Sequence, residues 1–293
     1  MRSEKEMFDL IAGTARDDER IRAVYMNGSR TNPNAPKDIF QDYDIVYVVT
    51  ETESFLQDKT WIDRFGELLI LQEPDKNDWF PGAAPDLSRR YAYLMLFADG
   101  NRIDLSLVTQ EVMMEEYLGD KLTVPLLDKD RCLPPIEPPT DAGYRVTRPS
   151  EARFRGCCNE FWWCLQNVAK GIWRDELPYA KRMFDHYVRD MLDEMVCWWI
   201  GTQNDFGVSA GKMGKYFKRL LPPAYWKMYE QTYSDGSYDN FWEAVFTATE
   251  LFRTLAAEAA GHLSFTYPVQ EDVNMTAYLQ HVRTLPADAE GVL

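Results

Sequence analysis

Short apolar runs separated by polar connections dominate the first half of the chain. Residues 3–20 carry apolar side chains at helical spacing, behind a serine N-cap with a glutamate three positions later. Runs rich in β-branched and aromatic residues predict buried strands. We expect strands over 21–28, 43–50 and 66–73, a helical stretch over 53–65, and two strands within 90–109 joined by a hairpin turn at Asp99-Gly100-Asn101. The pattern predicts a mixed α/β region around a central sheet.

The period of the apolar positions changes after a proline-rich stretch. Five prolines lie within "RCLPPIEPPTDAGYRVTRPS", residues 131–150, and interrupt any regular element there. Beyond this stretch, apolar stripes at a spacing of 3.6 residues predict helices over 154–168, 178–201, 239–262 and 271–284. The expected organisation is an α/β domain over 1–135, a connection over 136–150 and an all-α bundle over 151–293.

Two tryptophan pairs stand within the predicted helices, Trp162 with Trp163 and Trp198 with Trp199. They could form an adenine-stacking box, but their place in apolar stripes favours packing in the core of the bundle. The histidines are scattered singly, without a nearby nucleophile or ligand set, and we assign no role to them: His186, His262 and His281.

The net charge of the chain limits the classes of partner that we expect it to bind. A formal net charge of −15 over 293 residues argues against binding to nucleic acid, which needs clustered lysine and arginine, and favours cationic partners. The five cysteines have no C-x-x-C spacing, so a structural zinc site or a disulfide framework is not expected. We find no signal-peptide pattern and no apolar run of membrane-spanning length, and we expect a cytoplasmic protein without a membrane partner.

Three carboxylates in the predicted sheet carry the candidate chemistry. Asp42 and Asp44 open the strand over 43–50, and residues two apart on a strand point to one face. Two carboxylates at one point repel each other unless a divalent cation holds both, and magnesium suits such a sparse site. Asp104 stands alone in the apolar strand "RIDLSLV" and needs a partner. If it lies beside Asp44, three acids surround one centre.

Small and basic residues supply candidate phosphate contacts. Gly28 lets the backbone approach a ligand, and Ser29 offers a hydroxyl and an amide at a turn that favours anions. In "SAGKMGKYFKRLL", Lys212, Lys215 and Lys218 follow one another at three-residue spacing, roughly along one side of a helix. Either they form a solvated basic face, or Lys212 or Lys215 reaches the β- and γ-phosphates of a nucleotide.

Each of these signals has an ordinary structural explanation when it is taken alone. An Asp-x-Asp at a strand edge is commonly solvated or caps a turn, and a lone Gly-Ser pair is uninformative. Their combination is specific: an apolar strand, Gly-Ser, a short connection, Asp-x-Asp leading into a second strand, and a later strand with one acid. That order favours nucleotide chemistry.

The strings "GSR…DYDIV" and "RIDLSL" resemble the nucleotidyltransferase fold of the polymerase-β type. The longer string "MNGSRTNPNAPKDIFQDYDIVYVV" resembles the aminoglycoside 6-adenylyltransferases, which modify streptomycin. The likeness extends over nearly the whole chain, including "AKGIWRDELPYAKRMFD" and "GKMGKYFKRLLP" in the helical half. The resemblance implies an N-terminal nucleotidyltransferase domain and a helical domain that completes the nucleotide and acceptor cleft.

The resemblance also implies residue roles. Asp42 and Asp44 would hold Mg²⁺, Ser29 and Arg30 would contact ATP phosphates, and Asp104 would be the third acid. A hydroxyl of a cationic aminoglycoside, the 6-hydroxyl of streptomycin, would attack the α-phosphorus of ATP and release pyrophosphate. Asp104 would bind a second metal or accept the hydroxyl proton, and the sequence does not separate these roles. We expect a monomer.

Two other classes of function remain open beside the aminoglycoside-modifying enzyme. The same fold could modify a protein side chain, another small molecule or an RNA end, although the net acidity speaks against RNA. A non-catalytic interaction protein is the third class, but such a protein has little reason to keep all three acids.

The stretch over 72–90 is either a solvated loop or a wall of the acceptor site, in which Trp79 stacks on a guanidinium and Asp78 pairs with one.

Overall fold

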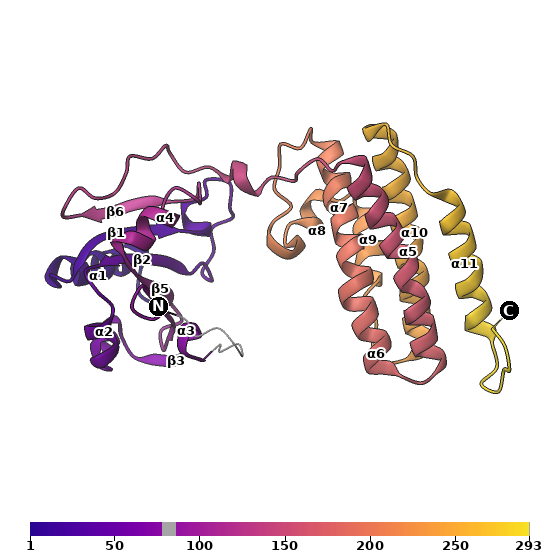
Figure 1. The fold of residues 1–293 in the computed structure, drawn as a ribbon, viewed down its shortest axis with the longest axis horizontal. Coiled ribbons are helices and arrows are strands. Elements are labelled where there is room, and N and C mark those ends of the chain that lie inside the picture. Colours follow the sequence, from indigo (N-terminus) through magenta and orange to yellow (C-terminus); the bar gives the residue numbers. More distant parts are fainter. Residues whose placement is uncertain (78–85, 293) are drawn as a thin grey trace. The chain divides into compact units, whose positions relative to one another are not determined.

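The computed structural model describes residues 1–77 and 86–292, and the chain divides into two units, Met1–Gly143 and Tyr144–Leu293 (Figure 1). The division falls inside the connection expected over 136–150. Each unit buries its own hydrophobic core, as separate domains do.

The first unit is built on a sheet that has six strands among the described residues, in the order β3-β4-β5-β2-β1-β6 (Figure 1). β2 and β5 are parallel neighbours, and every other neighbouring pair is antiparallel. The strands are β1 (Ile21–Asn27), β2 (Tyr43–Val49), β3 (Leu68–Gln72), β4 (Arg90–Phe97), β5 (Arg102–Thr109) and β6 (Val124–Asp128). The helices are α1 (Glu4–Asp17), α2 (Glu53–Gln57), α3 (Pro74–Asn77) and α4 (Gln110–Glu116). The predicted mixed sheet is confirmed, and β6 is a strand that the sequence pattern did not predict.

Alternation along β2 divides its side chains between two cores. Tyr43 and Tyr47 belong to the larger core, which includes apolar residues of α1. Val46 and Val48 belong to a smaller core on the other face, which includes residues of α4. Asp44 shares the face of Val46 and Val48, because side chains two apart on a strand point the same way. The sheet therefore directs Asp44 to the face that α4 covers.

Local side-chain hydrogen bonds set helix ends in the first unit. Ser3 and Glu6 form the predicted capping box at the start of α1. The helical stretch predicted over 53–65 is wrong as one element, because it breaks into α2 and a 3₁₀ turn over Trp61–Phe65. Asp58 lies at the break, where its carboxylate accepts hydrogen bonds from the backbone amide and hydroxyl of Thr60. This local bonding competes with a continued helix.

The second unit is helical, and its long helices lie side by side (Figure 1). Its helices are α5 (Glu151–Trp173), α6 (Leu177–Arg182), α7 (Arg189–Gln203), α8 (Phe217–Leu220), α9 (Pro223–Gln231), α10 (Tyr238–Leu263) and α11 (Val269–Thr284). A π-helical segment over Met183–Val188 joins α6 to α7, so the helix predicted over 178–201 contains one wider turn. The predicted bundle is confirmed. Within the part of the chain that the structure describes, no helix is long and apolar enough to cross a membrane.

Three of the four paired tryptophans pack in the core, as predicted. Trp162, Trp198 and Trp199 are buried, and Trp162 meets the rings of Phe161 and Phe252 edge to face. The prediction is wrong for Trp163, which is 62% exposed. Each residue along a helix turns the side chain by about 100°, and on α5 the step from buried Trp162 carries Trp163 out of the apolar stripe towards solvent.

The predicted basic helix around Lys212 is also wrong. Lys212–Gly214 form a 3₁₀ turn in which Met213 has left-handed backbone dihedrals, and Gly214 has a φ of 73°. α8 begins only at Phe217. Lys212, Lys215 and Lys218 are exposed, but a break in the helix separates the first from the last, so they do not share a helix face.

Candidate functional site

Three carboxylates meet where β2 and β5 begin. In the parallel pairing of these strands Asp44 lies opposite Asp104, which meets the condition stated in the sequence analysis, and Asp42 comes two residues before Asp44. Each of the three offers a carboxylate oxygen, and these oxygens lie within 4.8 Å of one another. All three residues are partly buried. Two neighbouring parallel strands and the loop before one of them therefore bring the acids to one point.

Burial and mutual repulsion raise the pKa of Asp44 to about 7. Loss of hydration is the largest cause, and the charges of Asp42 and Asp104 add to it. A carboxyl with this pKa is only about half ionised at pH 7, and compensating positive charge favours its full ionisation. A divalent cation with oxygen ligands supplies that charge, and oxygens this close suit the coordination of one hard cation. The residues present therefore fit a magnesium ion held by Asp42 and Asp44, with Asp104 beside them.

Arg102 is a member of this site that the sequence analysis missed. Its guanidinium donates to both oxygens of Asp104, at 2.7 Å from Nε and 2.6 Å from the second nitrogen, and its Nε lies 3.9 Å from Asp42. The ion pair with Asp104 raises the pKa of Arg102. The sequence contained a signal for this contact, because Arg102 and Asp104 are two residues apart on one strand and therefore share a face.

The absence of a side chain at Gly28 makes room for the carboxylate of Asp44. Its φ of 78° is in the left-handed region that glycine adopts without strain. A Cβ atom at this position would lie 1.8 Å from Oδ2 of Asp44, so that carboxylate occupies the space of the missing side chain. Ser29 follows at once and begins the 3₁₀ turn Ser29–Thr31. The Gly-Ser pair therefore lies directly beside the acid cluster.

Arg30 is engaged with the loop that carries Asp42. It donates to the backbone carbonyls of Asp42 at 2.9 Å and Gln41 at 2.7 Å, and it pairs with Glu4 at 3.2 Å. Its guanidinium lies 3.7 Å from the ring centre of Tyr43, and its side chain is only 12% exposed. These contacts fix the approach of the chain to Asp42. Contact of Arg30 with ATP phosphates stays a prediction, and in that role it would exchange some of these partners.

The remaining predicted contacts are on other parts of the chain. Lys212 and Lys215 belong to the second unit, and the roles predicted for them stay predictions. Asp78 and Trp79 lie outside the described residues.

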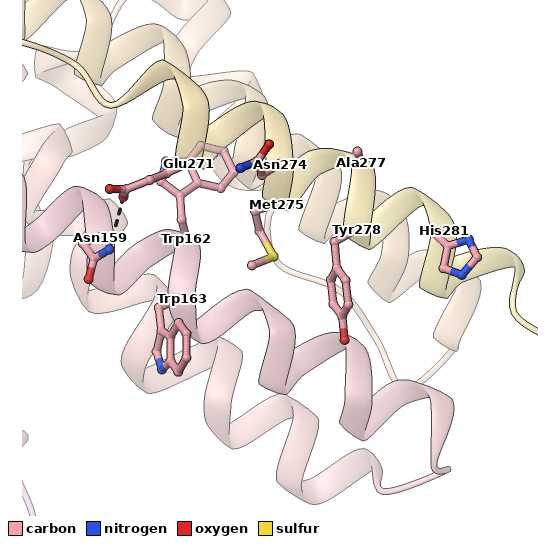
Figure 2. A pocket seen from close by; sticks show the side chains of 9 residues that line it. All are labelled: Asn159, Trp162, Trp163, Glu271, Asn274, Met275, Ala277, Tyr278 and His281. Atoms are coloured by element: carbon pink, nitrogen blue, oxygen red, sulfur yellow. Dashed lines mark hydrogen bonds between the residues drawn. The ribbon is translucent and has the colours of Figure 1, made fainter. Parts of the chain in front are cut away.

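The second unit contains a groove between α5 and α11 (Figure 2). Its volume is about 680 Å³, and exposed Trp163 and partly buried Tyr278 form part of its largely apolar lining. Asn159 donates a hydrogen bond to Glu271 across one end, at 3.2 Å. None of the residues predicted for nucleotide chemistry lines this groove.

The raised pKa of Asp44 predicts how the stability of the metal-free protein depends on pH. A carboxyl that holds its proton more tightly when folded stabilises the protein at low pH, and this stabilisation is lost as pH rises from 3.8 towards 7. Replacing Asp44 with asparagine should flatten this part of the profile. The free energies of unfolding of the two proteins should diverge by roughly 4 kcal/mol over this range, since a tenfold change in proton affinity corresponds to about 1.4 kcal/mol. Urea unfolding of both proteins in a chelator, at several pH values, measures it, and parallel profiles would contradict the assignment.

Comparison with known proteins gives consistent matches. A family model described as streptomycin adenylyltransferase matches residues 1–282. An aminoglycoside 6-adenylyltransferase of Campylobacter jejuni is 41% identical over 274 residues, which are 93% of this chain and 93% of that protein. One of Bacillus subtilis (strain 168) is 39% identical, over 96% of this chain and 98% of that protein. A crystal structure of an aminoglycoside 6-adenyltransferase from Bacillus subtilis covers 97% of this chain and 100% of that chain, at 34% identity and a TM-score of 0.48. The matched residues run through both units.

Proposed function

Because this chain belongs to the streptomycin adenylyltransferase family, we propose that it transfers AMP from ATP to the 6-hydroxyl of streptomycin and thereby confers resistance to that antibiotic. The observation that carries the proposal within the structure is the meeting of Asp42, Asp44 and Asp104 beside the Gly28-Ser29 turn. Full-length similarity to enzymes named aminoglycoside 6-adenylyltransferase supports the same reaction.

The acids have distinct proposed roles. Asp42 and Asp44 hold Mg²⁺, and Asp104 either ligates metal or accepts the proton of the attacking hydroxyl. When bound, the cation supplies charge neutralisation for the triphosphate and orients it. Burial and its acidic neighbours disfavour the charge of Asp44, and the cation would compensate that charge. A carboxylate near a metal is a weaker base, which distinguishes the two roles of Asp104 in a pH–rate profile.

The reaction is a displacement at the α-phosphorus of ATP. The acceptor oxygen forms a bond to that phosphorus, the bond to the pyrophosphate oxygen breaks, and the hydroxyl proton passes to a base. The protein's part is to position the groups and to compensate charge. Because Gly28 has no side chain, the carboxylate of Asp44 fits into the site. Ser29 offers a hydroxyl and an amide to phosphate oxygens. Arg30 holds the loop before Asp42 in place.

The acidity of the chain suits a cationic acceptor. A net charge of −15 attracts a sugar that carries guanidinium groups, and this attraction weakens as salt screens it. The same charge disfavours nucleic acid as a partner. We place the enzyme in the cytoplasm, where ATP is available, and expect it to work as a monomer, since one chain supplies all the proposed metal ligands.

Lys212 and Lys215 are proposed to contact the β- and γ-phosphates of ATP. Replacing either with alanine should raise the Michaelis constant for ATP by about tenfold, because a charge-assisted contact to phosphate contributes roughly 1.5 kcal/mol or more. Lys5→Ala, which removes an exposed lysine of α1, is the control. Steady-state kinetics with varied ATP measures the effect. Unchanged kinetic parameters in both variants would remove these lysines from the site.

Pyrophosphate release tests the proposed function. The protein is incubated with ATP, Mg²⁺ and one aminoglycoside at a time, and we expect release that depends on streptomycin. Release that requires a different small molecule or a protein acceptor would favour the alternative, a nucleotidyltransferase of the same fold with another acceptor. ATP binding without any release would support the non-catalytic class instead.

A further inference from the structure

Arg102 occupies the place that a cation would need at Asp104. Its two nitrogens donate to both oxygens of that carboxylate, and the same guanidinium lies 3.9 Å from Oδ2 of Asp42. Bidentate pairs of this kind are the strongest arginine–carboxylate contacts. The guanidinium therefore engages two of the three acids that form the candidate metal site.

A divalent cation and this guanidinium compete for the same oxygens. Both bind carboxylate lone pairs, and two positive charges at so short a distance repel each other strongly in a partly buried site. Asp104 is 19% exposed and Asp42 29%, so solvent screens the pair only in part. A cation that takes Asp104 as a ligand must displace Arg102 from it.

The fold does not depend on Arg102 for its register. β5 pairs with β2 from Ile103 to Thr109 and with β4 from Arg102 to Val108. The side chain of Arg102 is 48% exposed, and it is absent from the two hydrophobic cores of the unit. Its hydrogen bonds are to Asp104 and its guanidinium also lies close to Asp42, so its charge acts mainly on these acids.

We infer that Arg102 is an internal counter-ion that stands in for the divalent cation at the acid cluster and is displaced when the cation binds Asp104. The inference rests on the proposed function, because it requires a cation at Asp42 and Asp44. It assigns a positioning role: the guanidinium holds the carboxylate of Asp104 in one orientation before the substrates arrive. It also makes free cations bind weakly, so that the site favours a cation that arrives with a triphosphate, whose negative charge can pair with the released arginine.

Binding of Mn²⁺ to the whole protein, without nucleotide, tests the inference. Electron paramagnetic resonance of free Mn²⁺ gives the affinity of the wild type, Arg102→Gln and the control Arg90→Gln. Arg90 is matched: it also forms an ion pair at 43% exposure, but it lies opposite Val108, at the other end of β5. We expect Arg102→Gln to bind Mn²⁺ about tenfold more tightly than the wild type, since a repelling charge is gone, and Arg90→Gln to match the wild type. Equal or weaker binding by Arg102→Gln would overturn the inference.

Two additions separate this inference from the proposed function and from misfolding. Asp44→Asn should lose Mn²⁺ binding; if the wild type and this variant bind alike, the proposed metal site itself fails. If Asp44→Asn loses Mn²⁺ binding as expected, and Arg102→Gln binds Mn²⁺ no more tightly than the wild type, only the role inferred for Arg102 fails. Thermal unfolding with a chelator and with Mn²⁺ supplies the second readout: Mn²⁺ should raise the melting temperature of Arg102→Gln more than that of the wild type. Arg102→Lys, which keeps the charge, should return Mn²⁺ affinity towards the wild-type value.

Discussion

We expect the replacement of Asp44 with asparagine to lower adenylyl transfer by about a thousandfold or more and to leave the protein folded. The amide keeps the shape of the carboxyl but removes the charge that the cation needs, and losses of this order follow when one electrostatic partner of a transition state is removed. The fold should tolerate the change, because Asp44 is a carboxyl whose charge is disfavoured by burial and by two acidic neighbours. Turnover of ATP with streptomycin, together with a circular dichroism spectrum, measures both effects.

Matched variants make that result specific. Asp42→Asn should behave like Asp44→Asn, since both acids are proposed ligands of one cation. Asp9→Asn is the control, because Asp9 is an exposed aspartate on α1 that pairs with Lys5. Turnover like that of the wild type in either site variant would end the metal proposal.

Replacing Gly28 with alanine should lower transfer by about a hundredfold or more, although it alters no charged or polar side chain. The new Cβ would lie 1.8 Å from Oδ2 of Asp44, so the carboxylate must swing away from the cluster. A displacement of about 1 Å at a reacting centre is enough for such a loss. The φ of 78° also strains alanine, so a stability loss of roughly 1 kcal/mol should accompany it. Turnover and urea unfolding are measured on the same preparation.

Gly13→Ala provides the comparison for Gly28→Ala. Gly13 lies within α1, and a Cβ there meets no atom within 4 Å. Alanine should be neutral or slightly stabilising at this helical position. If Gly28→Ala turns over as fast as Gly13→Ala, Asp44 either moves freely or does not take part in the reaction.

The acid cluster was predictable because it follows from short-range rules. Period-two alternation places Asp42 and Asp44 on one face, and a single carboxylate in an apolar strand demands a partner. Parallel pairing of β2 with β5 then brings Asp104 opposite Asp44. The pairing itself joins strands that are far apart in sequence, so the sequence offered it only as a condition.

Features that depend on irregular backbone could not be predicted from the sequence. The carbonyls that accept hydrogen bonds from Arg30 belong to a loop without regular structure. No pattern in the sequence shows where a loop carbonyl points. The interruption near Lys212 depends on left-handed dihedrals at Met213, a conformation that sequence patterns rarely signal for a residue other than glycine. Side-chain spacing alone therefore predicted a helix where the backbone turns.

A structure of the protein with Mn²⁺ and a non-hydrolysable ATP analogue tests the central claim most directly. We predict an anomalous peak for manganese within bonding distance of the carboxylates of Asp42 and Asp44, in contact with phosphate oxygens of the analogue. A bound analogue whose triphosphate lies away from these carboxylates, with no cation between them, would contradict the account.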